Sequence, residues 1–433
     1  MSGSQFTEHS AQLPAFLEKL LDGAEVEWVA LGEVVLPTSN IKWQQATRTY
    51  RYIDLTSVDR QTNVITETSE ITAENAPSRA QKLVEKDDVI FATTRPTQMR
   101  YCLINEQYAG EVASTGYCVL RAKTTAVQPK WILHWVSSTA FKEYLEEHQS
   151  GSAYPAISDA KVKAFEIPIP CPDNPKKSLA IQAEIVRILD RFTELTAELT
   201  AELTARKKQY NHYRDQLLSF EEDEVEWMPL GEVGNFTYGY AAKAKISGDA
   251  RFVRITDINT NGKLSPDDRM YVDISQENER FILEKNDLLM ARTGATFGKT
   301  MIFEEEYPAI YAGFLIKLSL TPEAVNPKYY WHFSQSDMFW NQAKKLAAGG
   351  GQPQFNANAL KQVRFPVPYP HDPKKSLAVQ ARIVAILDKF DTLTHSISEG
   401  LPREIELRQK QYEYYRDLLL SFPKPESQSE VVA

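Results

Sequence analysis

The sequence has few cysteines, no long apolar run and no excess of positive charge. Its three cysteines, Cys102, Cys118 and Cys171, are odd in number and lack the Cys-x-x-Cys spacing of zinc sites. This usage argues against a disulfide framework and favours a reducing compartment. No apolar run approaches the roughly 18–20 residues that a membrane helix needs. The polar N-terminal residues also lack the features of a signal peptide, so we expect a cytoplasmic protein with no membrane partner.

The charge balance is acidic, with a formal net charge of −9 at pH 7. Nucleic-acid binders are usually basic, so this balance counts against DNA binding. It does not exclude DNA binding, because local patches and partner subunits can supply positive charge. The 433 residues suffice for two to four domains, and 42% hydrophobic with 25% charged residues is ordinary for a globular protein.

Three sequence motifs occur twice, in the same order along the chain. Chance does not produce three such matches, so we infer that the chain is an internal duplication. The pairs are EVEWVALGEV from Glu25 and EVEWMPLGEV from Glu224; PKKSLAIQAEIVRILDRF (175–192) and PKKSLAVQARIVAILDKF (373–390); and YNHYRDQLLSF (210–220) and YEYYRDLLLSF (412–422).

Two inserts, roughly residues 35–172 and 234–370, lie between these motifs and differ strongly in sequence. Two faint echoes remain, YRYIDLTSVDRQTNVI near Tyr50 against FVRITDINTNGKLS near Phe252, and KDDVIFATTRP near Lys86 against KNDLLMARTGA near Lys285. Constant connectors with divergent inserts indicate that two equivalent scaffolds hold two different recognition surfaces.

The connectors are predicted to be long helices. Apolar residues repeat at steps of 4 and 3, the pattern of a coiled coil, although one such stripe alone also fits a helix packed on its own domain. Asn174 and Asp372 precede prolines as predicted caps, and residues 399–402 (EGLP) predict a helix stop and restart. The stripes are Ile181, Ile185, Ile188, Phe192, Leu195 and Leu199, then Val379, Ile383, Ile386, Phe390, Leu393 and Ile397.

These connectors resemble the conserved regions of type IC specificity subunits of type I restriction–modification enzymes. FTELTAELTAELTARKKQY with YRDQLLSF is similar to the central region, and SEGLPREIELRQKQYEYYRDLL with FPKPE is similar to the C-terminal region. LEKLLDGAEVEW near Leu17 resembles the N-terminus of that family.

The resemblance implies a non-catalytic subunit that binds double-stranded DNA. It implies two methyltransferase subunits as partners and two further motor–nuclease subunits in the restriction enzyme. Each target recognition domain would recognise one half of a two-part, asymmetric site. S-adenosylmethionine, ATP and Mg²⁺ are then expected in the partner subunits, with no cofactor or metal in this chain.

The expected fold is α+β: two globular mixed α/β target recognition domains are separated by long helices that form an antiparallel coiled coil with a pseudo-twofold repeat. The expected segments are an N-terminal segment (1–24), recognition domain 1 (25–172), a central helical region (173–220), recognition domain 2 (221–370), a C-terminal helical region (371–422) and a disordered tail (423–433).

In the family, the number of TAEL repeats sets the length of the unread spacer between the half-sites. This chain carries two copies, Thr196, Ala197, Glu198, Leu199 and Thr200, Ala201, Glu202, Leu203. Four helical residues turn by a net ~40°, close to the ~34–36° turn of one base pair. One added repeat could therefore rotate a recognition domain by about the turn of one base-pair step.

No catalytic motif emerges from the sequence. GATFGKT (294–300) has three residues where a phosphate loop needs four, so we interpret it as a glycine-rich turn between strands. Asp372-Pro373-Lys374 resembles half of a nuclease motif but lies at a predicted helix cap, and the seven histidines form no metal-binding pair.

DNA contacts are expected from basic, amide and aromatic side chains of the inserts, because Arg and Lys pair with guanine or phosphate, and Asn and Gln with adenine. Two loops, GSAYPAIS near Gly151 and AAGGGQPQFN near Ala347, are expected at matching places. The candidates are Lys42, Arg48, Arg51, Arg95, Gln98, Arg100 and Tyr154 in the first insert, and Lys243, Lys245, Arg251, Arg254, Arg292, Lys299, Gln352, Gln354 and Asn356 in the second.

Two other hypotheses remain open from the sequence. A coiled-coil adaptor that gathers proteins without touching DNA fits the helices and the acidic charge but gives no reason for two divergent inserts. An enzyme with an unrecognised site lacks any cluster of catalytic residue types in its favour.

Overall fold

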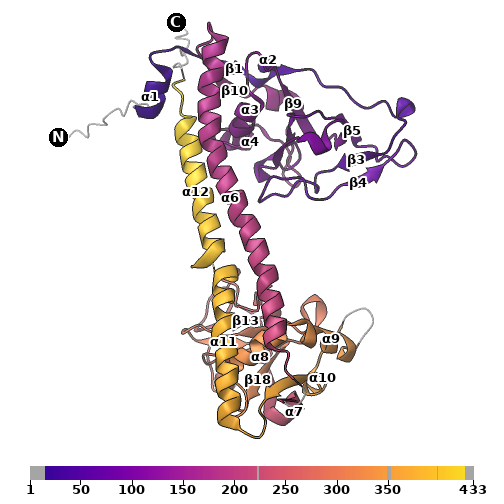
Figure 1. Ribbon diagram of the computed structural model, residues 1–433, viewed down its shortest axis with the longest axis vertical. Coiled ribbons are helices and arrows are strands. Elements are labelled where there is room, and N and C mark those ends of the chain that lie inside the picture. Colours follow the sequence, from indigo (N-terminus) through magenta and orange to yellow (C-terminus); the bar gives the residue numbers. More distant parts are fainter. Residues whose placement is uncertain (1–14, 222–223, 349–352, 397, 425–433) are drawn as a thin grey trace, which may run out of the picture. The chain divides into compact units, whose positions relative to one another are not determined.

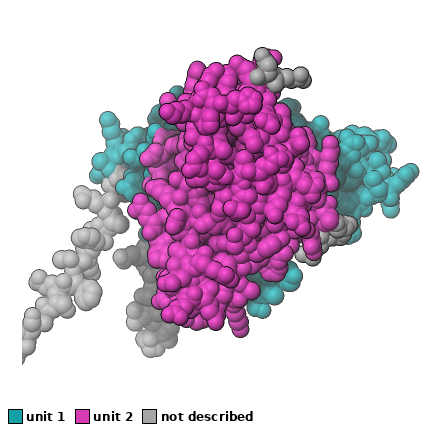
Figure 2. Space-filling view, turned by 90° about the horizontal axis from the view of Figure 1, so that it is seen from below, with its two compact units in different colours: residues 1–197, 406–433 teal, residues 198–405 magenta. Residues whose placement is uncertain are grey.

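The structure, a computed structural model, describes residues 15–221, 224–348, 353–396 and 398–424. The chain folds into two compact units, coloured separately in Figure 2: residues 1–197 with 406–433 form unit 1, and residues 198–405 form unit 2. Helices α6 (Pro175–Leu217) and α12 (Gly400–Leu419) cross the boundary between them. Each unit therefore combines one insert with helices from both copies of the repeat.

Some sequence predictions fall outside the described residues. These are most of the predicted N-terminal segment, the tail beyond Lys424, Gln352 in the second loop and Ile397 at the end of the second stripe.

Unit 1 is a mixed α/β domain packed on helices. Its helices are α1 (Ala15–Leu21), α2 (Leu31–Val34), α3 (Pro129–Val136), α4 (Thr139–His148), α5 (Asp159–Lys163), the first part of α6 and most of α12, with short 3-10 turns η1 (Trp43–Gln45), η2 (Pro96–Gln98) and η3 (Glu106–Tyr108). Its strands are β1 (Val26–Ala30), β2 (Val35–Leu36), β3 (Tyr50–Ile53), β4 (Ser69–Ile71), β5 (Ala80–Leu83), β6 (Val89–Ala92), β7 (Tyr101–Leu103), β8 (Val112–Ser114), β9 (Tyr117–Ala122) and β10 (Glu166–Pro170).

Unit 2 contains the same types of element. Its helices are the second part of α6, α7 (Leu230–Val233), α8 (Pro327–Ser334), α9 (Asp337–Leu346), α10 (Ala357–Lys361), α11 (Pro373–His395) and the start of α12, with turns η4 (Ile255–Asp257), η5 (Glu279–Phe281) and η6 (Gly294–Thr296). Its strands are β11 (Val225–Pro229), β12 (Gly234–Tyr238), β13 (Ala250–Val253), β14 (Tyr271–Val272), β15 (Leu288–Ala291), β16 (Thr300–Ile302), β17 (Ala309–Tyr311), β18 (Leu315–Leu320) and β19 (Arg364–Pro368).

The sheets of the two units have matching topologies. Unit 1 has strand orders β2-β9-β6-β7, β4-β3-β8-β5 and β1-β10, and unit 2 has β12-β18-β15-β16, β14-β13-β17 and β11-β19. The first sequence echo falls on β3 and β13, each antiparallel to one neighbour and parallel to the other. The second falls on the central strands β6 and β15. The duplication predicted from the connectors therefore extends through the divergent inserts.

A buried glutamine fixes each domain on the helix that follows it. Gln182 of α6 accepts a hydrogen bond from the backbone N–H of Gln128 at 3.0 Å and donates to Ala126 O at 3.1 Å. Gln380 of α11 makes the same pair with Asn326 N at 2.8 Å and Ala324 O at 2.9 Å. A buried amide left unpaired would cost about 1–3 kcal/mol, so this pair fixes the helix in one register.

The predicted helix caps and the helix stop are confirmed. Asn174 and Asp372 accept hydrogen bonds from backbone N–H groups of the first turns of α6 and α11, both at 3.0 Å. Helix α11 ends at His395 and α12 begins at Gly400, where φ is +78° and a Cβ atom would lie 2.5 Å from Thr392 O. Glycine meets both requirements of this turn.

The apolar stripes are shared between two sets of contacts. Figure 1 shows α6 antiparallel to α12 in unit 1 and antiparallel to α11 in unit 2. Phe192 stacks on Tyr415 with ring centroids 5.3 Å apart, and Phe390 stacks on Tyr213 at 5.5 Å. Earlier in α6, Leu189 is fully buried in the core of unit 1, where the stripe predicted Ile188 instead. Both the coiled-coil hypothesis and its alternative, packing on the helix's own domain, thus describe part of this helix.

Candidate nucleic-acid interface

The same edge of each unit brings a strand end against a loop from later in the chain. In unit 1 Thr94 bridges to Ala156, and in unit 2 Thr293 bridges to Gln354. Backbone hydrogen bonds join Arg95 N to Pro155 O at 2.7 Å and Gly294 N to Pro353 O at 3.2 Å. We call residues 93–98 with 150–156 the loop edge of unit 1, and residues 292–297 with 348 and 353–356 the loop edge of unit 2. The two loops singled out from the sequence thus occupy matching places.

The loop edge of unit 1 presents an arginine and an exposed aromatic ring. The guanidinium carbon of Arg95 lies 5.2 Å from the ring centroid of Tyr154, which is 73% exposed. Arg95 has φ of +50°, an uncommon left-handed conformation outside glycine that turns the chain into η2. Gln98, at the end of this turn, is exposed as well.

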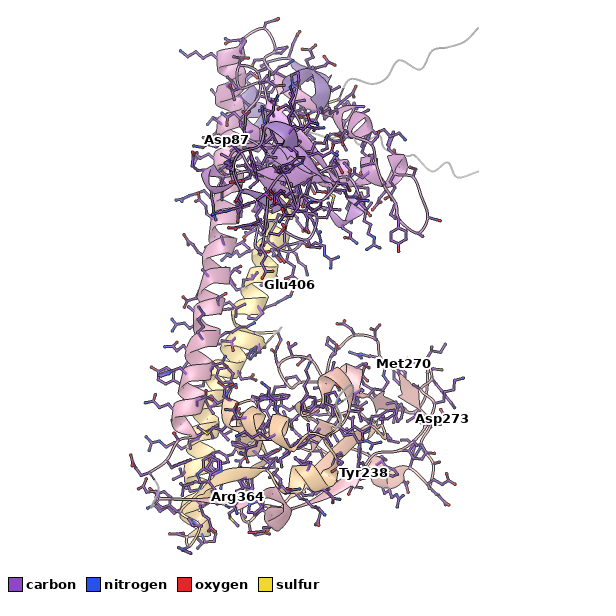
Figure 3. All side chains as sticks on the ribbon, turned by 90° about the vertical axis from the view of Figure 1, so that its right-hand side faces the viewer. Asp87, Tyr238, Met270, Asp273, Arg364 and Glu406 are labelled. Atoms are coloured by element: carbon purple, nitrogen blue, oxygen red, sulfur yellow. The ribbon has the colours of Figure 1, made fainter. Side chains whose placement is uncertain are left out.

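The loop edge of unit 2 places an arginine against two rings. The guanidinium carbon of Arg292 lies 5.1 Å from the ring centroid of Tyr238 and 5.4 Å from that of Phe314. Tyr238, labelled in Figure 3, is 42% exposed, and Phe314 is 56% exposed. Arg292 Nε donates to Gly313 O at 3.2 Å, and the Tyr238 hydroxyl accepts from Ala357 N at 3.1 Å. These contacts hold the rings and the guanidinium in one arrangement.

Two other candidates in unit 1 are engaged within the domain, and a third is half-buried. Arg48 pairs with Glu111 at 3.2 Å and donates to backbone oxygens, and Arg51 lies over the ring of Tyr108. Arg100 is half-buried, and its Nε makes no hydrogen bond among the residues that the structure describes. Lys42, by contrast, is exposed.

In unit 2, two basic candidates are paired with acids and one amide caps a helix. Lys245 pairs with Asp273, and Arg254 pairs with Asp257 at 2.8 Å. Asn356 is the N-cap of α10. Lys243 and Gln354 are exposed, and Lys299 lines a cavity beside α6.

Arg251 lies in the interior instead of on a recognition surface. It is 3% exposed, donates to Ser265 O, and has its Nη1 3.1 Å from the Tyr307 hydroxyl. The residue lies on β13, whose four residues are all buried. Its side chain therefore stabilises the sheet by binding groups that the sequence separates widely.

The eight predicted spacer residues, 196–203, continue α6 without interruption. Thr196 donates from its hydroxyl to Phe192 O one turn earlier, at 2.9 Å. Leu199 and Leu203 are half-buried, whereas the Ala-Glu pairs between them are exposed.

The sequence did not mark Tyr238 and Phe314 as candidates. Their exposure follows from the positions of β12 and β18 in one sheet, and no local pattern marks it. The alignment of the two copies holds one weak signal. A large aromatic residue, Phe314, stands directly before β18, whereas the matching residue before β9 is Gly116.

Comparison with known proteins identifies the family. The model of the type I restriction modification DNA specificity domain matches residues 25–206 and 222–407. The specificity subunit of the Escherichia coli type I restriction enzymes EcoR124I and EcoR124II is 39% identical over 430 residues, covering 96% of this chain and 99% of that protein. The chain belongs to the type I DNA specificity subunits.

A second relative agrees, and the resemblance seen in the connectors is confirmed. The specificity subunit of the Escherichia coli enzyme EcoprrI is 33% identical over 400 residues, covering 89% of this specificity subunit and 92% of its relative. The two matches of the family model correspond to two recognition domains. Specificity subunits of this family are non-catalytic.

Solved structures agree with the expected fold class. A chain from a study of complex assembly and conformational transition of the type I restriction–modification system superposes with a TM-score of 0.60 at 21% identity, covering 94% of this specificity subunit and 98% of that chain. The S subunit from M. genitalium gives a TM-score of 0.50 at 14% identity, covering 93% and 98%. At these identities the likeness concerns the fold alone.

Across the described ranges, no group of three or more His, Cys, Asp or Glu side chains could hold a metal ion. Within the same ranges, none of the helices has the length and apolar character needed to span a bilayer.

Proposed function

We propose that this specificity subunit recognises one asymmetric, two-part DNA sequence, with unit 1 binding one half and unit 2 the other. The loop edge is the observation that supports this most strongly. Both units place an arginine over an exposed aromatic ring at the same edge of the same fold. The surrounding side chains differ, as two unequal half-sites require, because sequence is recognised through side-chain contacts to base edges.

We propose that the contacts come first from candidates that have no carboxylate partner among the described residues. Candidates held by ion pairs or caps would have to share those partners, which suits phosphate contacts that position the duplex. The first set is Lys42, Arg51, Arg95, Gln98, Arg100 and Tyr154 in unit 1, and Lys243, Arg292, Lys299 and Gln354 in unit 2. The second set is Arg48, Lys245, Arg254 and Asn356. Arg251 is assigned to the interior, and Gln352 remains a candidate outside the described residues.

We propose that the subunit joins two methyltransferase subunits, and two motor–nuclease subunits in the restriction enzyme, all within the cytoplasm. The partners would bind S-adenosylmethionine, ATP and Mg²⁺. Exposed tyrosines at corresponding positions of the helices, Tyr213 on α6 and Tyr415 on α12, support a shared docking role for these helices. Repeated surfaces suit two copies of one partner.

The experiment is methylome sequencing of a methylation-deficient host that expresses this subunit with its methyltransferase subunit. We expect N6-methyladenine on both strands of one two-part motif with a fixed gap. Deleting residues 200–203 should shorten the gap by one base pair and leave both half-sites unchanged, because ~40° of helix rotation is removed. A purified complex that adds no methylation and binds no DNA at low salt would support a protein adaptor instead.

A further inference from the structure

We infer that Arg292 recognises a guanine in the half-site bound by unit 2. This inference rests on the proposed function and adds to it one residue, one base and one position. It is carried by the way Arg292 is held at the loop edge. There the guanidinium is fixed in place while its terminal nitrogens stay unused.

The first step is the immobilisation of the side chain. Arg292 is the residue directly after β15, and its backbone is bonded on both sides: its N–H donates to Phe314 O at 3.1 Å, and its carbonyl accepts from Phe355 N at 2.8 Å. Its Nε donates to Gly313 O. Two aromatic rings within about 5.5 Å of the guanidinium add cation–π attraction. Most of the entropy cost of ordering an arginine is thereby met before DNA binds.

The second step is the unused hydrogen-bonding capacity. Within the described ranges, Arg292 has no carboxylate within ion-pair distance, and its Nη1 and Nη2 groups donate no hydrogen bond. Arg254 of the same unit instead binds Asp257 through both Nε and Nη2. Anchoring through Nε leaves the two terminal nitrogens of this half-buried arginine available for a ligand. Guanine O6 and N7 accept such a pair, the commonest specific arginine contact with a base.

The third step is the exposed ring. Phe314 is 56% exposed although it is large and apolar. Among the described residues of unit 2, this ring lies against Arg292 and takes part in no aromatic pair. A ring beside a base-contacting arginine can pack against the neighbouring base pair, where a thymine methyl group offers an apolar surface. The matching edge of unit 1 also pairs an arginine with an exposed ring, but from other positions: Arg95 matches Gly294, and Tyr154 lies in the loop.

The test is the methylome of a host expressing the Arg292→Lys subunit with its methyltransferase subunit. A lysine keeps the charge but loses the planar fork, so a phosphate contact tolerates the change and a guanine contact does not. We expect one G·C position in one half-site to relax, with discrimination there falling from roughly 5- to 150-fold to only a few fold. The other half-site and the gap should not change.

Two further variants make the test specific. Phe314→Ala removes one of the two rings beside the Arg292 guanidinium. Discrimination at the same base pair should therefore fall in part. Arg364→Lys is the matched control, because Arg364 is an exposed arginine of the same unit that donates to Trp227 O, and Figure 3 labels it well apart from Tyr238. It should leave the motif unchanged.

Several results would overturn the inference while leaving the proposed function intact. These are a motif in which neither half-site contains a G·C pair, an unchanged motif in Arg292→Lys, or a uniform loss of methylation with all base preferences retained. Absence of any two-part motif with the unaltered subunit would instead contradict the proposed function itself.

Discussion

Units 1 and 2 are each completed by a tyrosine from the helix of the other repeat. Tyr412 of α12 lies 3.0 Å from His134 Nδ1 in unit 1, and Tyr210 of α6 lies 3.0 Å from His332 Nδ1 in unit 2. Burial lowers the pKa of both histidines, so both rings are neutral at pH 7. Nε2 of His332 carries the ring proton and donates to Asp388 at 2.8 Å, so Nδ1 accepts a hydrogen bond from the Tyr210 hydroxyl. Each recognition domain therefore depends on a helix from the other copy.

The two junctions differ in how well they are filled. Tyr101 and Thr300 occupy the same register, because β7 pairs with β6 as β16 pairs with β15. In unit 1, burial raises the pKa of Tyr101, whose ring reaches toward Tyr412 and Arg416. In unit 2, the small Thr300 leaves a cavity of about 320 Å³ lined also by Tyr210 and Arg214.

The arginines at these junctions differ in the same sense. Arg416 donates from Nε to Asp417 at 2.9 Å and from Nη2 to the Thr139 hydroxyl at 3.3 Å. Arg214 is as deeply buried, but its Nε has no hydrogen-bond partner in the described part of the chain and lies 3.6 Å from Asp215. Duplication thus preserved the tyrosine–histidine pair at both junctions, while its neighbours differ: in unit 1 the arginine Nε is hydrogen-bonded, and in unit 2 the histidine Nε2 is.

The largest effect on the free energy of unfolding is expected from exchanging Tyr101 and Thr300, the matching residues of the filled and the unfilled junction. Tyr101→Thr opens a cavity in unit 1 and should lower the free energy of unfolding by about 3 kcal/mol. Thr300→Tyr fills the cavity of unit 2 and should raise it by about 1 kcal/mol. Urea unfolding followed by hydrogen exchange assigns each change to its unit. Tyr154→Thr is the control, because this tyrosine is 73% exposed and should cost little. A loss below 1 kcal/mol for Tyr101→Thr would contradict the comparison.

A smaller effect, similar in both units, is expected at the shared pair. Tyr412→Phe and Tyr210→Phe each leave a buried histidine nitrogen without a donor, which costs about 1–3 kcal/mol. Faster amide exchange should appear around His134 for the first variant and around His332 for the second. Tyr414→Phe, at a 64% exposed tyrosine, is the matched control. Faster exchange around His134 in the Tyr210 variant would show that the helices are not exchanged between the repeats.

The sequence predicted much of the fold because its signals were local. The repeated motifs located the helices, the caps at Asn174 and Asp372 and the stop at Gly400, since each depends on a few neighbouring residues. The exchange of helices between the repeats was missed. His134 and His332 stand at matching places in WILHWVSS and YYWHFSQS, a further echo that could have pointed to it.

The candidate interface was harder to predict because it depends on long-range packing. Arg251 and Arg254 are close in sequence, yet Arg251 is buried and bonded to the Tyr307 hydroxyl, whereas Arg254 pairs with Asp257. Arg292 was named as a candidate, but the rings that hold it come from β12 and from just before β18, distant in sequence. Side-chain type alone cannot separate these cases, because burial depends on which strands pair.

The smallest effect on stability is expected at the position where unit 1 has Thr139 and unit 2 has the acid Asp337. Thr139 donates to Asp417 in unit 1 through both its N–H and its hydroxyl, whereas Asp337 occupies the matching place in unit 2. Burial and then Asp337 raise the pKa of Asp215, against the opposing charge of Arg214. Asp337→Thr removes this repulsion and supplies a donor. It also removes an acid that stabilises the N-terminus of α9, so we expect a net gain of only ~0.5 kcal/mol at pH 7.

The pH dependence distinguishes this cause from a packing effect. A carboxyl group with a raised pKa in the folded state destabilises the fold when it is ionised, and this cost disappears as the pH falls below 3.8, its ordinary value. The advantage of Asp337→Thr should therefore be present at pH 7 and vanish near pH 3.5 in urea unfolding. Glu323→Thr, which removes an exposed acid of the same unit, should give no such dependence. A gain that persists at pH 3.5 would mean that the two junctions differ in packing at this position and not in charge.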